Sequence, residues 1–163
     1  MITRITAGAF LVYGNKILLM KRGLHKEMSA GMWAGIGGHM ELADIDNLRA
    51  LKLIKTCYRE VKEETGIKKS QIKNLKLRYV AVRQVENEIR MHYHYLGEVE
   101  NEFPLPSCNE GELHWVEKND VPDLPMSITV SEAIKHWFHS PDNEGIFFIT
   151  VNPAGDCAVV SEI

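Results

Sequence analysis

The sequence predicts a mixed α/β sandwich, in which strands precede, separate and follow two helices. A chain of 163 residues is long enough to form one domain with a sizeable core. Its 45% apolar and 25% charged residues are ordinary for a soluble globular protein. Runs of β-branched and apolar residues alternate along the chain with two segments of helical periodicity. We therefore expect residues 1–163 to form a single domain.

The N-terminal half is expected to begin with a β-hairpin. Two apolar, β-branched runs flank Gly14-Asn15, which is a two-residue hairpin turn. Further along, apolar residues recur at three- and four-residue steps up to Thr65, and Gly66 follows as a helix stop. The expected elements are strands over 2–13 and 16–22, a loop over 23–43, and a helix from about 47 to 65.

The C-terminal half is expected to contain more strands and one further helix. Alternation over the segment His92-Tyr93-His94-Tyr95 places the histidines on one face of a strand and the tyrosines on the other. A turn at Asn152-Pro153-Ala154-Gly155 divides the last apolar segments into a hairpin. The expected elements are strands over 75–84, 90–99 and 113–116, a helix over 127–139, and a C-terminal β-hairpin at about 146–162.

Charge and cysteine content narrow the functional classes. The chain has 19 Lys and Arg against 22 Asp and Glu, a net charge of −3. Binding along a long nucleic acid needs a surplus of basic residues, so this charge argues against such a partner. It does not argue against one small polyphosphate. No apolar run approaches the ~20 residues of a membrane helix, and no secretory signal is visible. Cys57, Cys108 and Cys157 lack C-x-x-C spacing, so neither a zinc site nor a disulfide framework is indicated. We expect a cytoplasmic protein, monomeric or homodimeric.

Three glutamates near the end of the first predicted helix are the strongest indication of chemistry. At ~100° per residue, Glu60, Glu63 and Glu64 lie within one arc, away from the apolar face. Three like charges this close repel one another, and a divalent cation reverses that effect. Hard carboxylate oxygens suit Mg²⁺ or Mn²⁺. The alternative interpretation is a solvated acidic face on an amphipathic helix.

The residues before and within this helix resemble the signature of the Nudix hydrolases, G-x5-E-x7-R-E-U-x-E-E-x-G-U, where U is a bulky aliphatic residue. The second half matches fully, from Arg59 to Ile67, and Gly38 matches the leading glycine. Two departures occur. Asp44 stands where the family has Glu, and fourteen residues instead of seven separate it from Arg59.

The seven-residue insertion has two interpretations. Seven residues make almost two helical turns, so the insertion can lengthen the helix at its N-terminus and barely rotate the glutamate face. Alternatively, it enlarges the loop between Gly38 and the helix. In either case Asp44 or Asp46 can serve as the helix N-cap.

The resemblance implies an α/β/α sandwich around a mixed β-sheet and hydrolysis of a nucleoside diphosphate linked to a moiety X. Carried onto this chain, Glu60, Glu63 and Glu64 become ligands of a divalent metal, the carbonyl of Gly37 becomes a further ligand, and Arg59 has a structural role. The stretch Glu110-Gly111-Glu112-Leu113-His114-Trp115 is similar to one in triphosphatase-type members. By that similarity Glu110, or else Glu112, is an additional ligand or base. The general base is Glu60 or Glu110. An ordinary loop acid is the alternative interpretation for Glu110.

Substrate contacts are expected from residues around the same site. Arg22 ends the second strand, where related proteins place a basic residue near phosphates, and Gly38 lets the backbone approach the ligand. Trp33, Tyr93 and Phe10 are candidates for base stacking, with core packing as the alternative. His92 and His94 either line the pocket or face solvent, and His136 with His139 lacks the further ligands of a zinc site.

The triphosphatase-like context favours a nucleoside triphosphate that yields a monophosphate and pyrophosphate, with oxidised purine nucleotides among the candidates. Some oxidised-purine enzymes carry Trp-Asn-Gly-x-Gly-Gly, but Ala34 replaces the asparagine here and lacks its hydrogen-bonding side chain. Other members act on nucleotide sugars, dinucleotide polyphosphates or RNA caps. Two further alternatives are a non-catalytic nucleotide sensor and an acidic α/β interaction domain.

Overall fold

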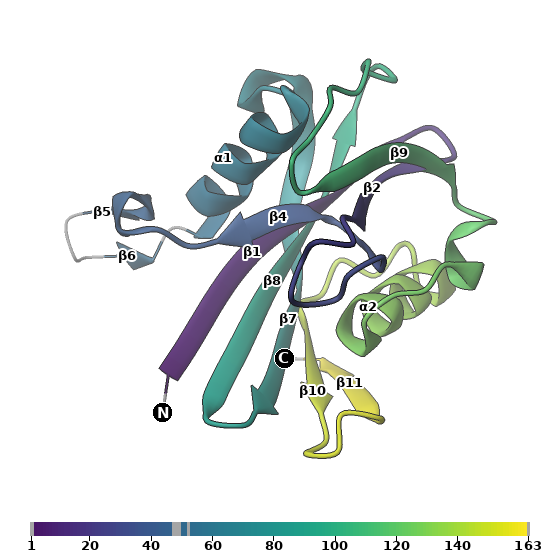
Figure 1. The fold of residues 1–163 in the computed structure, drawn as a ribbon. Coiled ribbons are helices and arrows are strands. Elements are labelled where there is room, and N and C mark those ends of the chain that lie inside the picture. Colours follow the sequence, from purple (N-terminus) through teal and green to yellow (C-terminus); the bar gives the residue numbers. More distant parts are fainter. Residues whose placement is uncertain (1, 47–49, 52, 163) are drawn as a thin grey trace.

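The structure is a computed structural model that describes residues 2–46, 50–51 and 53–162. A long, mixed β-sheet runs through the molecule, with one helix on each side (Figure 1). The elements in chain order are β1 (Ile2–Tyr13), β2 (Lys16–Arg22), β3 (Trp33–Ala34), β4 (Ile36–His39), the 3-10 turn η1 (Leu42–Asp44), β5 (Ile45–Asp46), β6 (Ala50–Leu51), α1 (Leu53–Thr65), η2 (Lys69–Gln71), β7 (Ile72–Val85), β8 (Glu88–Val99), β9 (Gly111–Glu117), η3 (Val121–Asp123), α2 (Ile128–His139), β10 (Phe147–Val151) and β11 (Ala158–Glu162).

Strand β1 is the centre of the sheet. It pairs in parallel with β8 along most of its length, and β8 pairs antiparallel with β7. On its other edge β1 changes neighbour, because residues 6–9 pair with β4 and residues 11–13 pair with β2. Beyond β7 the sheet continues into β10 and β11, which form the antiparallel hairpin expected near the C-terminus.

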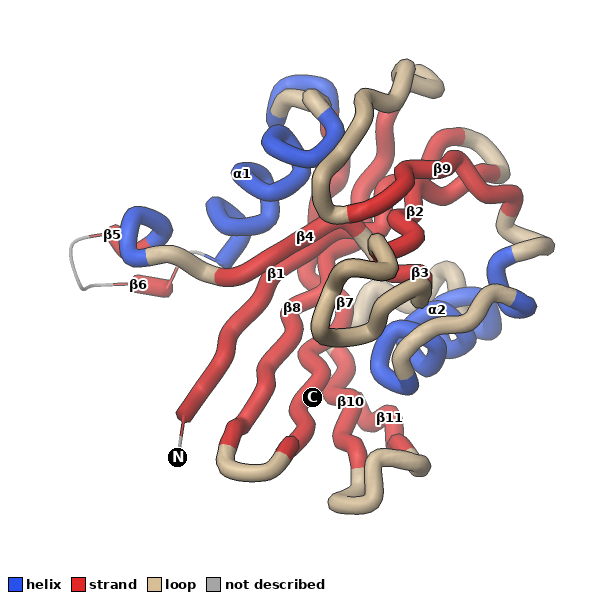
Figure 2. The backbone as a smooth tube through the Cα atoms, viewed as in Figure 1, coloured by secondary structure: helices blue, strands red, loops and turns tan. Residues whose placement is uncertain are grey.

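Two apolar cores hold the helices against opposite faces of the sheet, which gives the α/β/α sandwich (Figure 2). On one face, Cys57 and Val61 of α1 pack against Leu11 and neighbouring sheet residues. On the other face, Ala133 and Ile134 of α2 belong to the second buried cluster. Alternation along β1 sends successive side chains to the two cores.

The insertion does not lengthen the first helix. Helix α1 begins at Leu53 instead of about residue 47, and Ile45–Asp46 pairs antiparallel with Ala50–Leu51. The expected helix start at 47 falls on residues 47–49, which lie outside the described part. The apolar spacing of Ala50 and Leu51 matched a helical period, but a two-residue strand accommodates it equally well. Of the two interpretations, the structure therefore supports the enlarged loop.

The other expected strands and the second helix are present with adjusted ends, but the expected loop over 23–43 is wrong, because its residues 33–34 and 36–39 form β3 and β4. The β1–β2 hairpin turns at Gly14, whose φ of +55° is readily available to glycine. Strands β7 and β8 each extend beyond the predicted ranges, and they are joined by a turn that contains Glu86 at positive φ. No helix in the described part of the chain is long and apolar enough to cross a membrane.

Candidate active site

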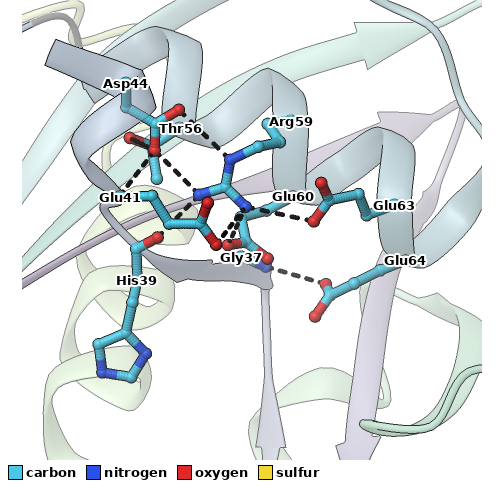
Figure 3. Close-up of polar contacts among 9 residues, drawn as sticks. All are labelled: Gly37, His39, Glu41, Asp44, Thr56, Arg59, Glu60, Glu63 and Glu64. Carbon is cyan, nitrogen blue, oxygen red and sulfur yellow. Dashed lines mark hydrogen bonds and ion pairs between the residues drawn. The ribbon is translucent and has the colours of Figure 1, made fainter.

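Helix α1 presents its acidic side to the loop that follows β4. Val61 and Cys57 are fully buried in the core, and the three glutamates of the signature lie on the other side of the helix (Figure 3). Glu64 is only 8% exposed, whereas the Glu63 side chain is 58% exposed. The common arc of three carboxylates predicted from helical spacing is therefore present, with unequal burial across it.

Arg59 joins this acidic side of the helix to the loop. Its Nη2 donates to the His39 carbonyl and to Asp44 Oδ2, both at 2.9 Å. Its Nη1 donates to Glu60 Oε1 at 2.8 Å and to Glu63 Oε2 at 3.2 Å. One guanidinium thus holds two signature carboxylates and the segment after β4 together, a bracing arrangement suited to its planar set of donors (Figure 3).

Asp44 is a buried partner of this guanidinium and does not cap α1. Its side chain is 6% exposed and accepts hydrogen bonds from Arg59, from the Thr56 hydroxyl at 2.9 Å and from the Glu41 N–H at 2.9 Å. The hydrogen bond from Arg59 is the main reason why the pKa of Asp44 falls to about 2. The N-cap prediction for Asp44 is wrong, because η1 and the β5–β6 pair separate it from the helix start. The Asp46 side chain lies outside the described residues.

Glu64 and Glu60 are carboxylates that the protein holds in an unfavourable environment. Burial, followed by the charge of Glu60, raises the pKa of Glu64 to about 8, although the Gly37 N–H donates to Glu64 Oε2 at 3.2 Å. Burial also raises the pKa of Glu60, against the opposing effect of Arg59. A nearby cation would favour the charged form of both groups.

Gly37 and Gly38 allow strand β4 to pass between the helix and β1. A Cβ at Gly38 would lie 2.5 Å from the Glu60 carboxyl group. A Cβ at Gly37 would collide with the backbone of Ala7 and Gly8, to which β4 is paired. Backbone contact therefore requires glycine at Gly37, whereas a side chain at Gly38 would displace the Glu60 carboxyl group.

A cavity of about 800 Å³ lies beside these carboxylates and brings most of the predicted site residues together. Glu112 is not among its lining residues, and its side chain is 77% exposed. Glu110 lines the cavity and is ion-paired with Lys26. The predicted site residues that line the cavity are Arg22, Trp33, Gly37, Gly38, Glu60, Glu63, Glu64 and Glu110.

The carboxylates are not yet arranged around one point. Within the described part of the chain, no three His, Cys, Asp or Glu side chains are gathered tightly enough to hold a metal ion as they stand. Glu60 and Glu63 are turned to Arg59, and Glu64 is turned to the Gly37 N–H. Loading a cation therefore requires small side-chain rotations away from these partners.

The aromatic candidates divide between core and cavity. Phe10 is 1% exposed and stacks on His94 and Trp137, so it belongs to the core. Trp33 and Tyr93 are partly buried and line the cavity. His94 also lines the cavity, which excludes the alternative that it simply faces solvent.

The remaining histidines have ordinary partners. His92 lines the cavity and its Nδ1 lies 2.6 Å from the Thr6 hydroxyl. His136 Nδ1 lies 3.1 Å from the Tyr79 hydroxyl, and His139 Nδ1 lies 2.7 Å from the Lys135 carbonyl. These last two side chains contact the core and the helix backbone.

Sequence reasoning missed three arginines that line the same cavity, Arg4, Arg83 and Arg90. They come from β1, β7 and β8, and the strand register places them side by side. The alternation Arg90-x-His92-x-His94 is a partial signal in the sequence. Its meaning depends on knowing which strands are neighbours.

Comparison with known proteins identifies the class of this fold and site. The model of the NUDIX domain family matches residues 2–138, most of the chain. The chain therefore belongs to the Nudix family, and it is a hydrolase that acts on phosphoanhydride bonds. Members of this family generally use divalent metal ions.

Solved structures with the same fold include a MutT protein from Bacillus halodurans, with 23% identity over 97% of each chain and a TM-score of 0.69. A MutT NUDIX hydrolase from Burkholderia pseudomallei is 25% identical, with 82% of this chain and 96% of that chain covered and a TM-score of 0.60. An Ap4A hydrolase from C. elegans is 16% identical, with 83% and 96% covered and a TM-score of 0.64. No curated protein matches the sequence significantly.

Proposed function

We propose that this Nudix hydrolase is a metal-dependent pyrophosphohydrolase that converts a nucleoside triphosphate to the monophosphate and pyrophosphate. The observation that carries the proposal is a pair of carboxylates, the buried Glu64 and the half-buried Glu60, held beside Gly37 and Gly38 at one wall of a large cavity. Oxidised purine nucleotides are candidate substrates within this class. The products follow from the triphosphatase-like sequence around Glu110.

The donor set fits Mg²⁺ or Mn²⁺. Glu60, Glu63, Glu64 and Glu110 offer carboxylate oxygens, and Gly37 offers a backbone carbonyl, which are the hard ligands that these ions prefer. The burial that raises the pKa of Glu64 to about 8 makes a neighbouring cation favourable. When bound, the ion neutralises phosphate charge, polarises the phosphorus and lowers the pKa of water.

The side chains of the chain then have distinct tasks. Arg59 orients Glu60 and Glu63 through hydrogen bonds. Asp44 holds the Arg59 guanidinium in place when these carboxylates turn to a cation. Glu60 or Glu110 accepts the proton of the attacking water. Arg22 binds a phosphate, and Trp33 contacts the nucleoside from the cavity wall.

A second candidate is a dinucleoside polyphosphate. The structural likeness to an Ap4A hydrolase supports it at the level of the fold. The cavity of about 800 Å³ is large enough for more than one nucleotide portion to enter. Nucleotide sugars and RNA caps contain the same diphosphate linkage, and a nucleotide sensor would bind without turnover.

The decisive experiment is a substrate panel assayed with and without Mg²⁺, with monophosphate, pyrophosphate and phosphate resolved as products. Glu63→Gln and Glu64→Gln are each expected to lower turnover at least a hundredfold while the far-UV circular dichroism stays unchanged. Glu132→Gln, at a half-exposed position of α2 that does not line the cavity, is the matched control and should retain wild-type activity. Full activity of both signature variants at saturating Mg²⁺ would contradict the metal-site assignment. Absence of metal-dependent release from every nucleotide would favour the sensor.

We also propose a cytoplasmic enzyme with a small nucleotide as its partner. Cys57, Cys108 and Cys157 are all free thiols, and Cys57 is buried. This is consistent with a reducing compartment. A monomer and a homodimer both remain compatible with the sequence, and sedimentation analysis distinguishes them.

A further inference from the structure

Three arginines form a row across the floor of the cavity, at the end away from the signature helix. Arg4 of β1 is paired with Arg90 of β8, and Arg90 is paired with Arg83 of β7. Directly paired residues on neighbouring strands point to the same face, so three cationic side chains stand next to one another. All three line the same cavity as Glu60 and Glu64. Like charges in such a row destabilise the sheet unless an anion compensates them.

Protein groups compensate only part of this charge. Glu88 accepts from Arg4 Nε at 2.7 Å and from Arg90 Nε at 3.0 Å. Arg83 makes no hydrogen bond or ion pair with any residue in the described ranges, and its Nε is shielded from solvent. One carboxylate thus serves two of the three guanidinium groups, and the terminal nitrogens of the row remain available to a ligand in the cavity.

The arginine row lowers the pKa of a neighbouring histidine that lines the same cavity. His92 lies beside Arg90 on β8, and burial lowers its pKa to about 4, with further contributions from Arg83 and Arg90. The imidazole is therefore neutral near pH 7, and it adds no charge to the row. Arg83 is half-buried and its Nε is shielded from solvent without a partner in the described ranges, which favours a ligand that carries a full negative charge over a neutral carbonyl.

The spacing separates this row from the site of hydrolysis. Gly8 is paired with Gly37 beside the signature carboxylates, and Arg4 lies four residues earlier on the same strand. At ~3.3 Å per residue, the two ends are about 13 Å apart. The two phosphorus atoms of a diphosphate share one bridging oxygen, so a diphosphate is much shorter than this backbone separation. A phosphate from another part of the substrate therefore suits the row better than the diphosphate being cleaved.

We infer that Arg4, Arg83 and Arg90 form a phosphate-binding subsite for a phosphate group that the substrate carries outside the diphosphate being cleaved. This inference rests on the proposed function for its substrate. It keeps the proposed metal-dependent cleavage of a diphosphate linkage, and among such substrates it favours compounds with an additional phosphate monoester or a second phosphorylated unit over a simple nucleoside triphosphate. Guanidinium groups bind phosphate oxygens through paired N–H donors, which matches the unpaired nitrogens of the row.

The first test uses inorganic phosphate and needs no catalysis. Titration calorimetry of the full chain in EDTA, at constant ionic strength, measures phosphate binding when the carboxylate end repels anions. We expect the wild type to bind phosphate, Arg83→Gln to bind it at least tenfold more weakly, and Arg83→Lys to fall between them. Lys76→Gln, on the same strand but ion-paired with Glu144, is the matched control and should bind like the wild type. Absent binding, or equal binding by the wild type and Arg83→Gln, would overturn the subsite.

The second test assigns the phosphate to the substrate. Two matched pairs of diphosphates, NADP with NAD and coenzyme A with its 3′-dephospho form, differ by one phosphate monoester. We expect kcat/KM to be at least fivefold higher for the phosphorylated member of one or both pairs, through KM, and this ratio to fall toward one in Arg83→Gln. Equal values for both members of both pairs would contradict the substrate assignment.

The two tests keep the proposals distinguishable. Phosphate binding that depends on Arg83, in a protein without turnover, would retain the subsite and refute the proposed function. Metal-dependent turnover without phosphate binding would do the reverse. Urea unfolding of Arg83→Gln checks that the variant folds. Because the Arg83 guanidinium has no partner among the described residues, we expect the stability of the variant to match or exceed that of the wild type.

Discussion

The ion pair between Asp44 and Arg59 should stabilise the folded protein measurably, and Asp44→Asn removes its charge while it keeps the size of the side chain. The pKa of Asp44 falls from 3.8 to about 2 on folding, chiefly through the Arg59 hydrogen bond. At ~1.4 kcal/mol per tenfold change in proton affinity, this corresponds to about 2.5 kcal/mol at pH 7. In the variant the Arg59 guanidinium keeps its hydrogen bonds to the His39 carbonyl, Glu60 and Glu63, so the loss should be close to this value.

The sign of the pH dependence follows from the lowered pKa. The folded protein holds the ionised form of Asp44, so its contribution is fully present above the ordinary pKa of 3.8 and disappears as the pH falls through about 2. At pH 3 about half of the difference between wild type and variant should remain. Asp44→Asn should therefore differ from the wild type by about 2.5 kcal/mol at pH 7 and by progressively less below pH 4.

Urea unfolding followed by tryptophan fluorescence at pH 7, 5, 4 and 3 measures this difference. Asp142→Asn, in an exposed loop, is the control and should change the free energy of unfolding by less than ~0.5 kcal/mol. In Asp44→Asn the Arg59 guanidinium is also free to move toward Glu60 and Glu63, so the half-saturating Mg²⁺ concentration for hydrolysis should rise several-fold. A stability within ~0.5 kcal/mol of wild type at every pH would refute the reasoning.

Three further predictions concern other parts of the molecule. Gly38→Ala should lower turnover at least tenfold with little change in melting temperature, because its Cβ would displace the flexible Glu60 carboxyl group, and a wild-type rate would contradict this. When the pH falls from 7 to 5, His94→Phe should lose about 2 kcal/mol less free energy of unfolding than the wild type. Burial lowers the pKa of His94 from 6.5 to about 3, so below pH 6.5 protons bind the unfolded chain preferentially; unfolding curves at the two pH values test it. Deletion of the seven residues 45–51 should preserve metal-dependent hydrolysis. A variant that folds but is inactive would mean that the insertion shapes the site.

Much of the signature site could be predicted from the sequence, because the spacing of residues along a helix fixes the side of the helix on which each side chain lies. The arrangement of Glu60, Glu63 and Glu64 depends only on ~100° per residue, and the structure places all three on one side of α1. Similarly, Gly14-Asn15 encodes the first hairpin in two residues, since the turn requires a positive φ that glycine adopts readily. These features are local, so neighbouring residues contain the information.

The insertion shows the limit of such local reasoning. Apolar spacing at Ala50 and Leu51 fits both a helix and a strand, and the pairing with Ile45–Asp46 decides between them. Likewise, Asp44 is a plausible N-cap by sequence, but its carboxylate is held by Arg59, fifteen residues further along. Only the path of the loop brings these two groups together.

By itself, then, the sequence determined the class of protein and the acidic side of its signature helix, since both follow from short-range spacing and identity. The tertiary structure decided which residues form the rest of the cavity. Arg4 and Arg90 lie far apart in the chain and become neighbours only because β1 and β8 are paired in parallel. Strand pairing is a long-range choice made by the whole core, and the spacing of residues along one segment does not encode it.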